Sequence, residues 1–302
     1  MIRPVTHGET EKARFEVNSS WEGFVPISSN YFSSVISISF SAFDPFNSPE
    51  EQADPREGTC YFYVGLKSYA DKDGAILKSL NELYGEFIES LNICLSEAGK
   101  RRRWLSAINT LESDDNFSEM NLASLADIEV EQRTEQALSL QKRMSSGHAI
   151  VLLTITKLVA HLAEKTLVLF DEPESHLHPP LLSALIRSLS ELLDDRNAVA
   201  IVATHSPVVL QEIPKSCVWK IMRAGLASSS IRPESETFGE NVGLLTRDVF
   251  GLEVAKSGFN ALLAVEAEQA LTYEQALNAF DQQLGFEGRA ILRSLMHSKS
   301  KQ

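Results

Sequence analysis

The chain has 302 residues, of which 43% are hydrophobic and 23% are charged, as in an ordinary globular protein of one large or two modest domains. Its 28 lysines and arginines against 41 aspartates and glutamates give a formal net charge of −13, which argues against a surface that binds nucleic acid broadly, although a local basic patch would survive that average. The three cysteines have no metal-binding or redox spacing, and this predicts a reducing compartment rather than a disulfide framework.

Neither a secretory signal nor a membrane span is predicted. The first ten residues contain no apolar core. The most apolar segment, residues 149–163, is interrupted by Lys157 and His161 and is shorter than the roughly 18 apolar residues that a span needs. We therefore expect a soluble, cytoplasmic protein with no membrane partner, in which this segment is a buried helix.

Three strands are predicted in residues 1–66, the first part of an α/β core. Residues 14–17 are a candidate edge strand, and residues 35–40 and 59–66 are better patterned strands. Pro45 should turn the chain out of the sheet, and residues 47–58 have the composition of a loop.

Residues 67–143 are predicted to form a mostly helical insertion between strands of the sheet. Apolar residues recur at helical spacing after Gly74, and Asp73 and Gly99 stand where a long amphipathic helix would begin and end. The basic run at residues 100–103 would then oppose the negative end of the helix dipole. A more polar, partly helical stretch follows, with a break at residues 114–116.

Residues 144–232 alternate between helices and strands, and residues 233–302 are expected to be a mainly helical C-terminal region. The predicted elements of the alternating part are a helix opening at residues 144–148, a strand at 166–170, a helix at 179–193, a strand at 198–203, a short helix at 208–213 and a strand at 217–222. This order predicts an α/β fold with a parallel sheet and right-handed crossovers.

The most informative stretch is the buried strand at residues 166–170, which ends in Asp171 and Glu172. Open α/β sheets bind ligands beyond the carboxyl ends of their strands. Two adjacent carboxylates there are costly unless a cation or a proton uses them. Phosphoryl-transfer ATPases need such a pair, with one acid in the magnesium shell and one to orient or deprotonate the attacking water. The alternative interpretation is that the two acids only cap the following turn.

Two further segments fall where they would complete such a site. His205 follows the next strand, and its imidazole can hydrogen-bond a phosphate oxygen or the attacking water. Taken alone, His205 would be an ordinary loop residue before a helix capped by Ser206. Ser145, Ser146 and Gly147 precede free backbone N–H groups at a helix start, which is a site for phosphate and also an ordinary helix cap.

These pieces, in this order, resemble the ABC-type ATPase family. Residues 145–148 (SSGH) look like the signature motif, residues 167–172 (LVLFDE) like Walker B, residues 175–178 (SHLH) like the D-loop, and His205 like the switch histidine. The form DEPESHLHP is closest to the AAA-type ATPases of the overcoming-lysogenization-defect and SMC-like branch. Together with residues 40–46 (FSAFDPF) and the tail at residues 250–254 and 285–289, it looks like the ATPases of Septu and retron-linked antiphage systems.

The resemblance implies a P-loop NTPase fold and a role for each matching position. It places Asp171 on Mg²⁺, makes Glu172 the general base and has His205 sense the γ-phosphate of ATP. Ser145, Ser146 and Gly147 would reach the nucleotide held by a second subunit, so that the active unit is a head-to-tail homodimer. Ser175, His176 and His178 of the D-loop would lie at the dimer contact.

The sequence departs from this family at two places. It contains no G-x-x-x-x-G-K-[ST], and its nearest approach, residues 251–257 (GLEVAKS), is one residue short and follows no convincing strand. The P-loop supplies the amide cradle and the lysine that neutralise the phosphates. We expect the P-loop strand and helix to lie upstream of Met1. The second departure is His148, where the signature usually has glutamine.

Three more segments suggest other chemistry. Arg101, Arg102 and Arg103, next to Trp104, could hold DNA or RNA by charge and stacking, or could simply end a helix. His176 and His178 with a nearby glutamate have a metal-like pattern, but the ligands would be crowded into one turn, and the D-loop interpretation explains them better. Residues 262–266 faintly resemble the start of a Toprim nuclease domain, and we interpret them as a helix because too few residues follow.

Three functional hypotheses remain open. The first is an Mg-dependent ATP-hydrolysing motor or sensor subunit that dimerises on ATP and drives an effector, such as a nuclease, in antiphage defence. The second is a nucleotide-incompetent interaction module that keeps the second half of the fold and its dimer surface. The third is a DNA-repair ATPase of the RecF or SMC kind.

Overall fold

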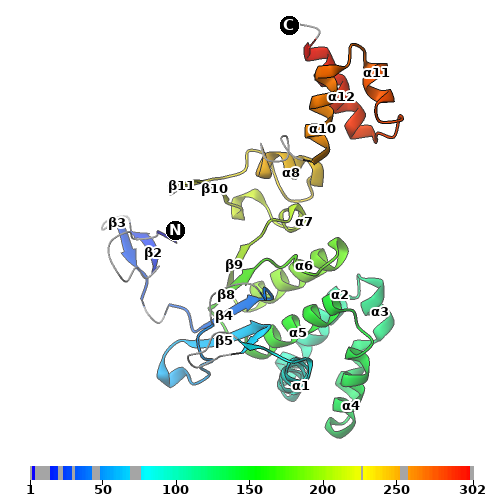
Figure 1. Cartoon of the computed structure of the whole chain (residues 1–302). Coiled ribbons are helices and arrows are strands. Elements are labelled where there is room, and N and C mark those ends of the chain that lie inside the picture. The colour runs from blue at the N-terminus through cyan, green and yellow to red at the C-terminus, as the bar shows by residue number, and fades with distance from the viewer. Residues whose placement is uncertain are drawn as a thin grey trace. The chain divides into compact units, whose positions relative to one another are not determined.

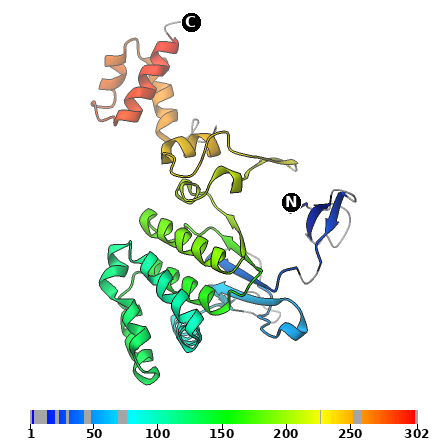
Figure 2. The ribbon, with the colours of Figure 1, turned by 180° about the vertical axis from the view of Figure 1, so that it is seen from behind.

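The computed structural model describes residues 2–3, 14–19, 23–28, 31–42, 48–68, 76–225, 227–251 and 258–299 (Figures 1 and 2). Several sequence predictions lie outside these residues. They are the helix start at Asp73, the turn at Pro45 and most of the segment at residues 251–257.

The chain divides into two compact units, residues 1–205 and residues 206–302. The sequence predicts domain limits at residues 66, 143 and 232. The boundary between the two compact units follows His205, inside the alternating region at residues 144–232. The finer limits stay a prediction.

The first unit is built on a four-stranded parallel sheet, as the alternating pattern predicts. The strand order is β5-β4-β8-β9, and the bounds are Ser34–Ser39 for β4, Cys60–Gly65 for β5, Thr166–Asp171 for β8 and Val199–Ala203 for β9. Ser39, Asp171 and Ala203 stand abreast in this register. Asp171 therefore lies at the carboxyl edge of the sheet, next to the ends of its neighbouring strands.

Four helices gather on one side of this sheet (Figures 1 and 2). They are α1 (Leu80–Ser96), α2 (Ala98–Leu111), α5 (Ser146–His161) and α6 (Pro179–Asp195). Helix α5 is apolar nearly all round, as predicted, because it packs between the sheet and the other helices. The alternate strand residues that face it, such as Ile36, Ile38, Val168 and Phe170, are buried in the same core.

The predicted limits of the long helix, from Asp73 to Gly99, are wrong. Helix α1 begins at Leu80 because Ser79 and Glu82 form a reciprocal capping box, a stronger start than the predicted one. The chain then breaks at Glu97, which has an extended backbone, and restarts as α2. Gly99 and the basic run at residues 100–103 consequently lie in the first turns of α2 rather than at a helix end.

The rest of the insertion is helical, as predicted. It contains α3 (Asp115–Met120), a 3₁₀ segment (Leu122–Asp127) and α4 (Val130–Gln141). The predicted break is confirmed, since Asp114 caps α3 by accepting hydrogen bonds from the backbone N–H groups of Asn116 and Phe117.

Short strands complete the described part of the first unit. β1 (Ile2–Arg3), β2 (Arg14–Ser19) and β3 (Gly23–Pro26) pair antiparallel with one another in that order. β6 (Lys67–Ser68) pairs with β7 (Ile76–Leu77), and a 3₁₀ turn (Pro55–Glu57) interrupts the predicted loop. The candidate strand at residues 14–17 is thus confirmed within β2.

The second unit is mainly helical, as predicted. Its helices are α7 (Pro207–Gln211), α8 (Val242–Phe250), α10 (Gly258–Gln269), α11 (Tyr273–Asn278) and α12 (Phe286–Lys299), with a 3₁₀ turn at Lys215–Cys217. The predicted strand at residues 217–222 is β10 (Lys220–Ala224), which forms an antiparallel hairpin with β11 (Ala227–Ile231) and does not extend the parallel sheet. Residues 262–266 lie inside α10, which confirms the helix interpretation.

Across the described ranges, no helix is both long and apolar enough to cross a bilayer.

Candidate functional site

The acidic pair sits where the strand pattern predicts. Asp171 is the last residue of β8 and is exposed at the carboxyl edge of the sheet. Glu172 follows with a left-handed backbone (φ 46°), which is uncommon for a residue with a side chain. Its N–H still donates to the Ala203 carbonyl at 2.9 Å, so the β8–β9 pairing continues through the bend. This bend ends the strand and leaves the Glu172 side chain half-exposed beside the end of β9.

His205 and Glu172 are brought together by the two neighbouring strand ends. His205 Nε2 lies 3.6 Å from Glu172 Oε1, and the imidazole is 82% exposed. The imidazole of His205 and the carboxylate of Glu172 therefore face the same solvent-accessible space, although the two residues are 33 positions apart in the chain with a complete helix between them. The sequence predicts this meeting, because carboxyl ends of adjacent parallel strands share one edge.

Glu174 positions His205, a role that the sequence pattern does not predict. Glu174 Oε1 accepts a hydrogen bond from the backbone N–H of His205 at 2.6 Å, and Oε2 accepts one from Thr204 Oγ1 at 2.9 Å. The carboxylate thus fixes the end of β9 against the turn after β8. The one sequence feature that points to this role is the position of Glu174, the last acid of the Asp-Glu-Pro-Glu run, directly after the acidic pair.

The predicted signature residues form the first turn of α5. Ser145 caps this helix, with its Oγ accepting from the backbone N–H of His148 at 3.4 Å. Ser146 is exposed, whereas Gly147 is buried against the backbone of His176. A Cβ atom at Gly147 would stand 2.7 Å from the His176 carbonyl oxygen. The glycine therefore allows α5 to approach the loop that follows β8.

The predicted D-loop residues point in different directions. Ser175 Oγ lies 3.5 Å from Glu172 Oε2, and His176 is exposed with a left-handed backbone (φ 69°). His178 turns toward the insertion, where its Nε2 lies 3.2 Å from Asp114 Oδ2. The crowded metal pattern considered for His176, His178 and Glu174 does not form, because Glu174 is engaged at the end of β9.

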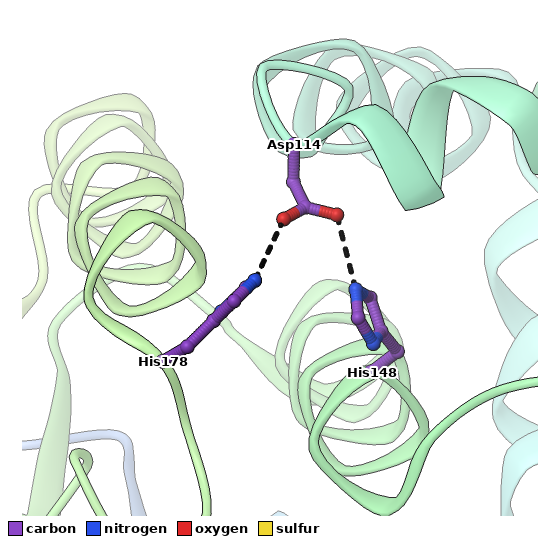
Figure 3. A group of neighbouring side chains, drawn as sticks. All are labelled: Asp114, His148 and His178. Carbon is purple, nitrogen blue, oxygen red and sulfur yellow. Dashed lines mark hydrogen bonds and ion pairs between the residues drawn. The ribbon is translucent and has the colours of Figure 1, made fainter.

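Asp114 also binds His148, so three elements meet at one carboxylate (Figure 3). His148 Nε2 lies 3.0 Å from Asp114 Oδ1. Burial would raise the pKa of Asp114, but the hydrogen bonds from His148 and from the Phe117 N–H outweigh burial and hold the pKa below its ordinary value. The sequence predicts only a helix break at Asp114, since the local pattern does not show which side chains a capping carboxylate contacts.

The basic segment at residues 101–104 does not expose an aromatic ring for stacking, as the nucleic-acid hypothesis expects. Trp104 is fully buried, and its Nε1 donates to Thr156 Oγ1 at 3.1 Å, so its ring cannot stack on bases. Arg101 pairs with Asp127 at 2.7 Å, and Arg103 lies 3.6 Å from Asp195. The stacking component of the nucleic-acid hypothesis is therefore wrong. A contact of Arg101, Arg102 and Arg103 with DNA or RNA stays a prediction that rests on charge alone.

The arrangement at the end of β8 is suited to hydrolysis of a metal-bound phosphoanhydride. Exposed carboxylate oxygens such as those of Asp171 are the ligands that Mg²⁺ prefers. A second carboxylate and an imidazole beside them can orient water and donate to a phosphate oxygen. The residues present thus fit Mg²⁺ and a nucleotide, while the phosphate cradle has no counterpart in the sequence.

Comparison with known proteins identifies the family of the chain. Residues 6–211 match the family described as "AAA domain, putative AbiEii toxin, Type IV TA system". The chain is also similar to Protein ea59 of Escherichia phage lambda, with 50% identity over 319 aligned positions that cover 100% of this chain and 60% of that protein. The chain thus spans less than two thirds of the length of this relative. Because the family match covers more than half of the chain and the parallel sheet agrees with a P-loop NTPase fold, the chain belongs to this AAA domain family of nucleotide-binding ATPases.

Proposed function

We propose that this chain is an ABC-type subunit that binds and hydrolyses Mg-ATP and works as a head-to-tail dimer. The observation that carries the proposal is the placement of Glu172 and His205 3.6 Å apart, next to Asp171 at the carboxyl edge of a parallel sheet. A capping role for the acidic pair would not require a histidine from the neighbouring strand at the same place.

Each of these residues has a distinct task in the proposed reaction. Asp171 would hold the ion, directly or through water, and the bound Mg²⁺ would neutralise charge on the β- and γ-phosphates. Glu172 would orient the attacking water and take its proton. His205 would donate a hydrogen bond from Nε2 to the γ-phosphate, held in place by the hydrogen bond from its own N–H to Glu174.

The proposed dimer rests on the first turn of α5. Ser145 and Ser146 are exposed there. The first backbone N–H groups of a helix have no carbonyl partner within it, which favours binding of a phosphate, and here Ser145 Oγ caps the N–H of His148. In the ABC arrangement, these residues face the nucleotide of a second subunit. The proposal requires a phosphate cradle from outside these 302 residues, whether on polypeptide joined to them or on another chain.

We further propose that hydrolysis is coupled to an effector, such as a nuclease, in antiphage defence in the cytoplasm. This rests on the resemblance to Septu and retron-linked ATPases and agrees with the toxin–antitoxin wording of the family description. The nucleotide-incompetent interaction module is the second candidate, and the RecF- or SMC-like repair ATPase is the third.

The base assignment is tested by Glu172→Gln in the protein provided with its phosphate cradle. The matched control is Glu164→Gln, an exposed acid just before the opposite end of β8. We expect Glu172→Gln to lower the single-turnover rate of Mg-ATP hydrolysis by about 100-fold or more, as loss of a general base does, while a fluorescent ATP analogue still binds. Glu164→Gln should match the wild type.

Equal turnover in Glu172→Gln and the wild type would contradict the assignment. If the wild type with its cradle binds no Mg-ATP, the interaction-module hypothesis replaces ours. If hydrolysis requires DNA, and loss of the arginines at positions 101–103 removes that requirement, the repair-ATPase candidate gains over the defence proposal.

A further inference from the structure

Three side chains from distant parts of the sequence converge at one point in the first unit (Figure 3). Asp114 precedes α3 in the insertion, His148 lies in the first turn of α5, and His178 immediately precedes α6. One donor atom from each residue lies within 4.8 Å of the donor atoms of the other two. In the described part of the chain, this is the one group of three or more such residues with this spacing.

The distances suit a small ion as well as a hydrogen bond. His148 Nε2 is 3.0 Å from Asp114 Oδ1, and His178 Nε2 is 3.2 Å from Asp114 Oδ2. A tetrahedral zinc ion with bonds of about 2.0–2.1 Å keeps neighbouring ligand atoms roughly 3.3 Å apart. An ion could therefore enter with only small movements of the three side chains.

Surrounding contacts hold two of the three residues in place. Asp114 and His148 are 5% and 7% exposed. His148 Nδ1 lies 2.6 Å from Ser145 Oγ, and Asp114 Oδ1 is oriented by the N–H groups of Asn116 and Phe117. Hydrogen bonds of this kind behind a ligand fix the ring orientation and tautomer of metal-binding histidines. With Nδ1–H donating to Ser145, Nε2 of His148 offers its lone pair to an ion.

We propose that Asp114, His148 and His178 form a binding site for a divalent transition-metal ion of the zinc class. Two imidazoles and one carboxylate match the ligand preference of such ions, whereas Mg²⁺ prefers oxygen ligands alone. The side chain of His178 is 47% exposed, which leaves a route for the ion and room for water as a fourth ligand. The site is separate from the proposed Mg²⁺ position at Asp171, and it does not depend on the proposed function.

Such an ion would link the predicted signature turn, the predicted D-loop and the helical insertion. His148 follows the predicted signature residues, His178 ends the predicted D-loop, and Asp114 belongs to the helical insertion. Without an ion, Ser145 can donate to Nδ1 while Nε2–H of His148 donates to Asp114. Binding would then move the single ring proton of His148 from Nε2 to Nδ1, so that the tautomer shifts without net release of a proton from this ring.

The experiment titrates the chelator-treated, dialysed full chain with Co²⁺, which reports its ligands by visible absorption, and then displaces the cobalt with Zn²⁺. The ligand variants are Asp114→Asn, His148→Gln and His178→Ala. Asparagine at position 114 retains an oxygen for the α3 cap, so this variant should fold, as circular dichroism would verify. His176→Ala is the control, since His176 lies two residues from His178 but outside the cluster.

We expect one Co²⁺ per wild-type chain, displaced by Zn²⁺ but not by excess Mg²⁺, and a rise in Tm with saturating Zn²⁺. Each ligand variant should weaken binding at least about 100-fold, a larger effect than the roughly 10–100-fold expected for outer residues. His176→Ala should titrate like the wild type. The proposal is overturned if the wild type shows no saturable cobalt spectrum, if Mg²⁺ displaces the cobalt, if folded ligand variants bind normally, or if His176→Ala loses the site.

Discussion

Gly147, in the first turn of α5, packs against the loop after β8. A Cβ atom there would stand 2.7 Å from the carbonyl oxygen of His176 and 3.3 Å from Leu177 Cδ2. His176 itself has a left-handed backbone (φ 69°), so its carbonyl is set by an uncommon conformation. The glycine is thus needed for packing within one chain, in addition to any role toward a nucleotide.

We predict that Gly147→Ala destabilises the protein by about 1–3 kcal/mol, the usual cost of adding a methyl group to a filled site. Urea unfolding measures this. The control is Gly85→Ala in α1, where a Cβ atom meets nothing within 4 Å and alanine should stabilise the helix by about 0.5–1 kcal/mol. A Gly147→Ala protein as stable as the wild type would show that the loop moves freely away from α5.

The residues of the site were predictable to different degrees. Asp171, Glu172 and His205 follow from strand ends, because their positions depend only on where apolar runs stop. Glu174 and Asp114 do not, since their partners lie 31 and 34 residues away and depend on how a loop and an insertion fold back. His148 was treated as a tolerated departure from glutamine, and its contact with Asp114 could not be inferred from α5 alone.

At the scale of elements, Trp104 ties α2 to α5. Its indole Nε1 donates to Thr156 Oγ1 at 3.1 Å, and both residues are fully buried. We predict that Thr156→Val costs about 1–3 kcal/mol, because it leaves a buried N–H without a partner. Trp104→Phe should also destabilise, through the lost hydrogen bond and the space left behind.

The double variant Trp104→Phe with Thr156→Val tests whether the hydrogen bond is the cause. Since each single change already removes the bond, the double variant should lose less free energy of unfolding than the sum of the two single variants. Strictly additive losses in urea unfolding would show that packing alone holds Trp104.

His161, where α5 packs against β5, should make the free energy of unfolding depend on pH. Its ring stacks on Phe62 with centroids 4.2 Å apart, and burial, aided by Lys157, lowers the pKa of His161 from 6.5 to about 4. Between these two values, the unfolded chain binds a proton that the folded chain does not. The free energy of unfolding should therefore fall as the pH drops from 6.5 toward 4. Below pH 4, His161 should cause no further decrease.

We predict that His161→Phe, which keeps an aromatic ring against Phe62, loses this part of the acid sensitivity. Urea unfolding of wild type and variant at pH 7.5, 6, 5 and 4.5 measures the difference. Parallel stability curves across this range would contradict the assignment, because carboxylates shared by both proteins would then explain the whole slope.

The elements of the sheet were predicted more accurately than the helices around it. Short apolar runs ending in turn residues identify β4, β5, β8 and β9 almost residue for residue. The start of α1 was misplaced because Asp73 and Ser79 are both acceptable caps, and only the capping box with Glu82 decides between them. The sequence predicts Trp104 at the surface, next to a basic run, because the break between α1 and α2 at Glu97 leaves no periodic signal that would show which face of α2 is buried.

At the scale of the whole molecule, the residues of the proposed nucleotide site, from Ser145 to His205, lie in the first compact unit. The family match extends from residue 6 to residue 211, close to the boundary after His205. The predicted limit of the core at residue 232 includes β10, which the alternating pattern assigned to the parallel sheet. Among the described residues, that strand pairs only with β11, and the limit itself stays a prediction.

The proposed head-to-tail dimer takes Glu172 of each active site from one subunit and Ser146 from the other. Glu172→Gln and Ser146→Arg should therefore each abolish turnover as homodimers, for different reasons. A mixed dimer keeps one intact site, formed by Glu172 of the Ser146→Arg subunit and Ser146 of the Glu172→Gln subunit.

The most direct test is the rate of Mg-ATP hydrolysis by an equimolar mixture of these two inactive variants, each provided with its phosphate cradle. With random pairing and independent sites, half of the dimers are mixed and each has one working site, so the mixture should recover about a quarter of the wild-type rate. A mixture no more active than its two components would contradict a shared active site built from Glu172 and the first turn of α5.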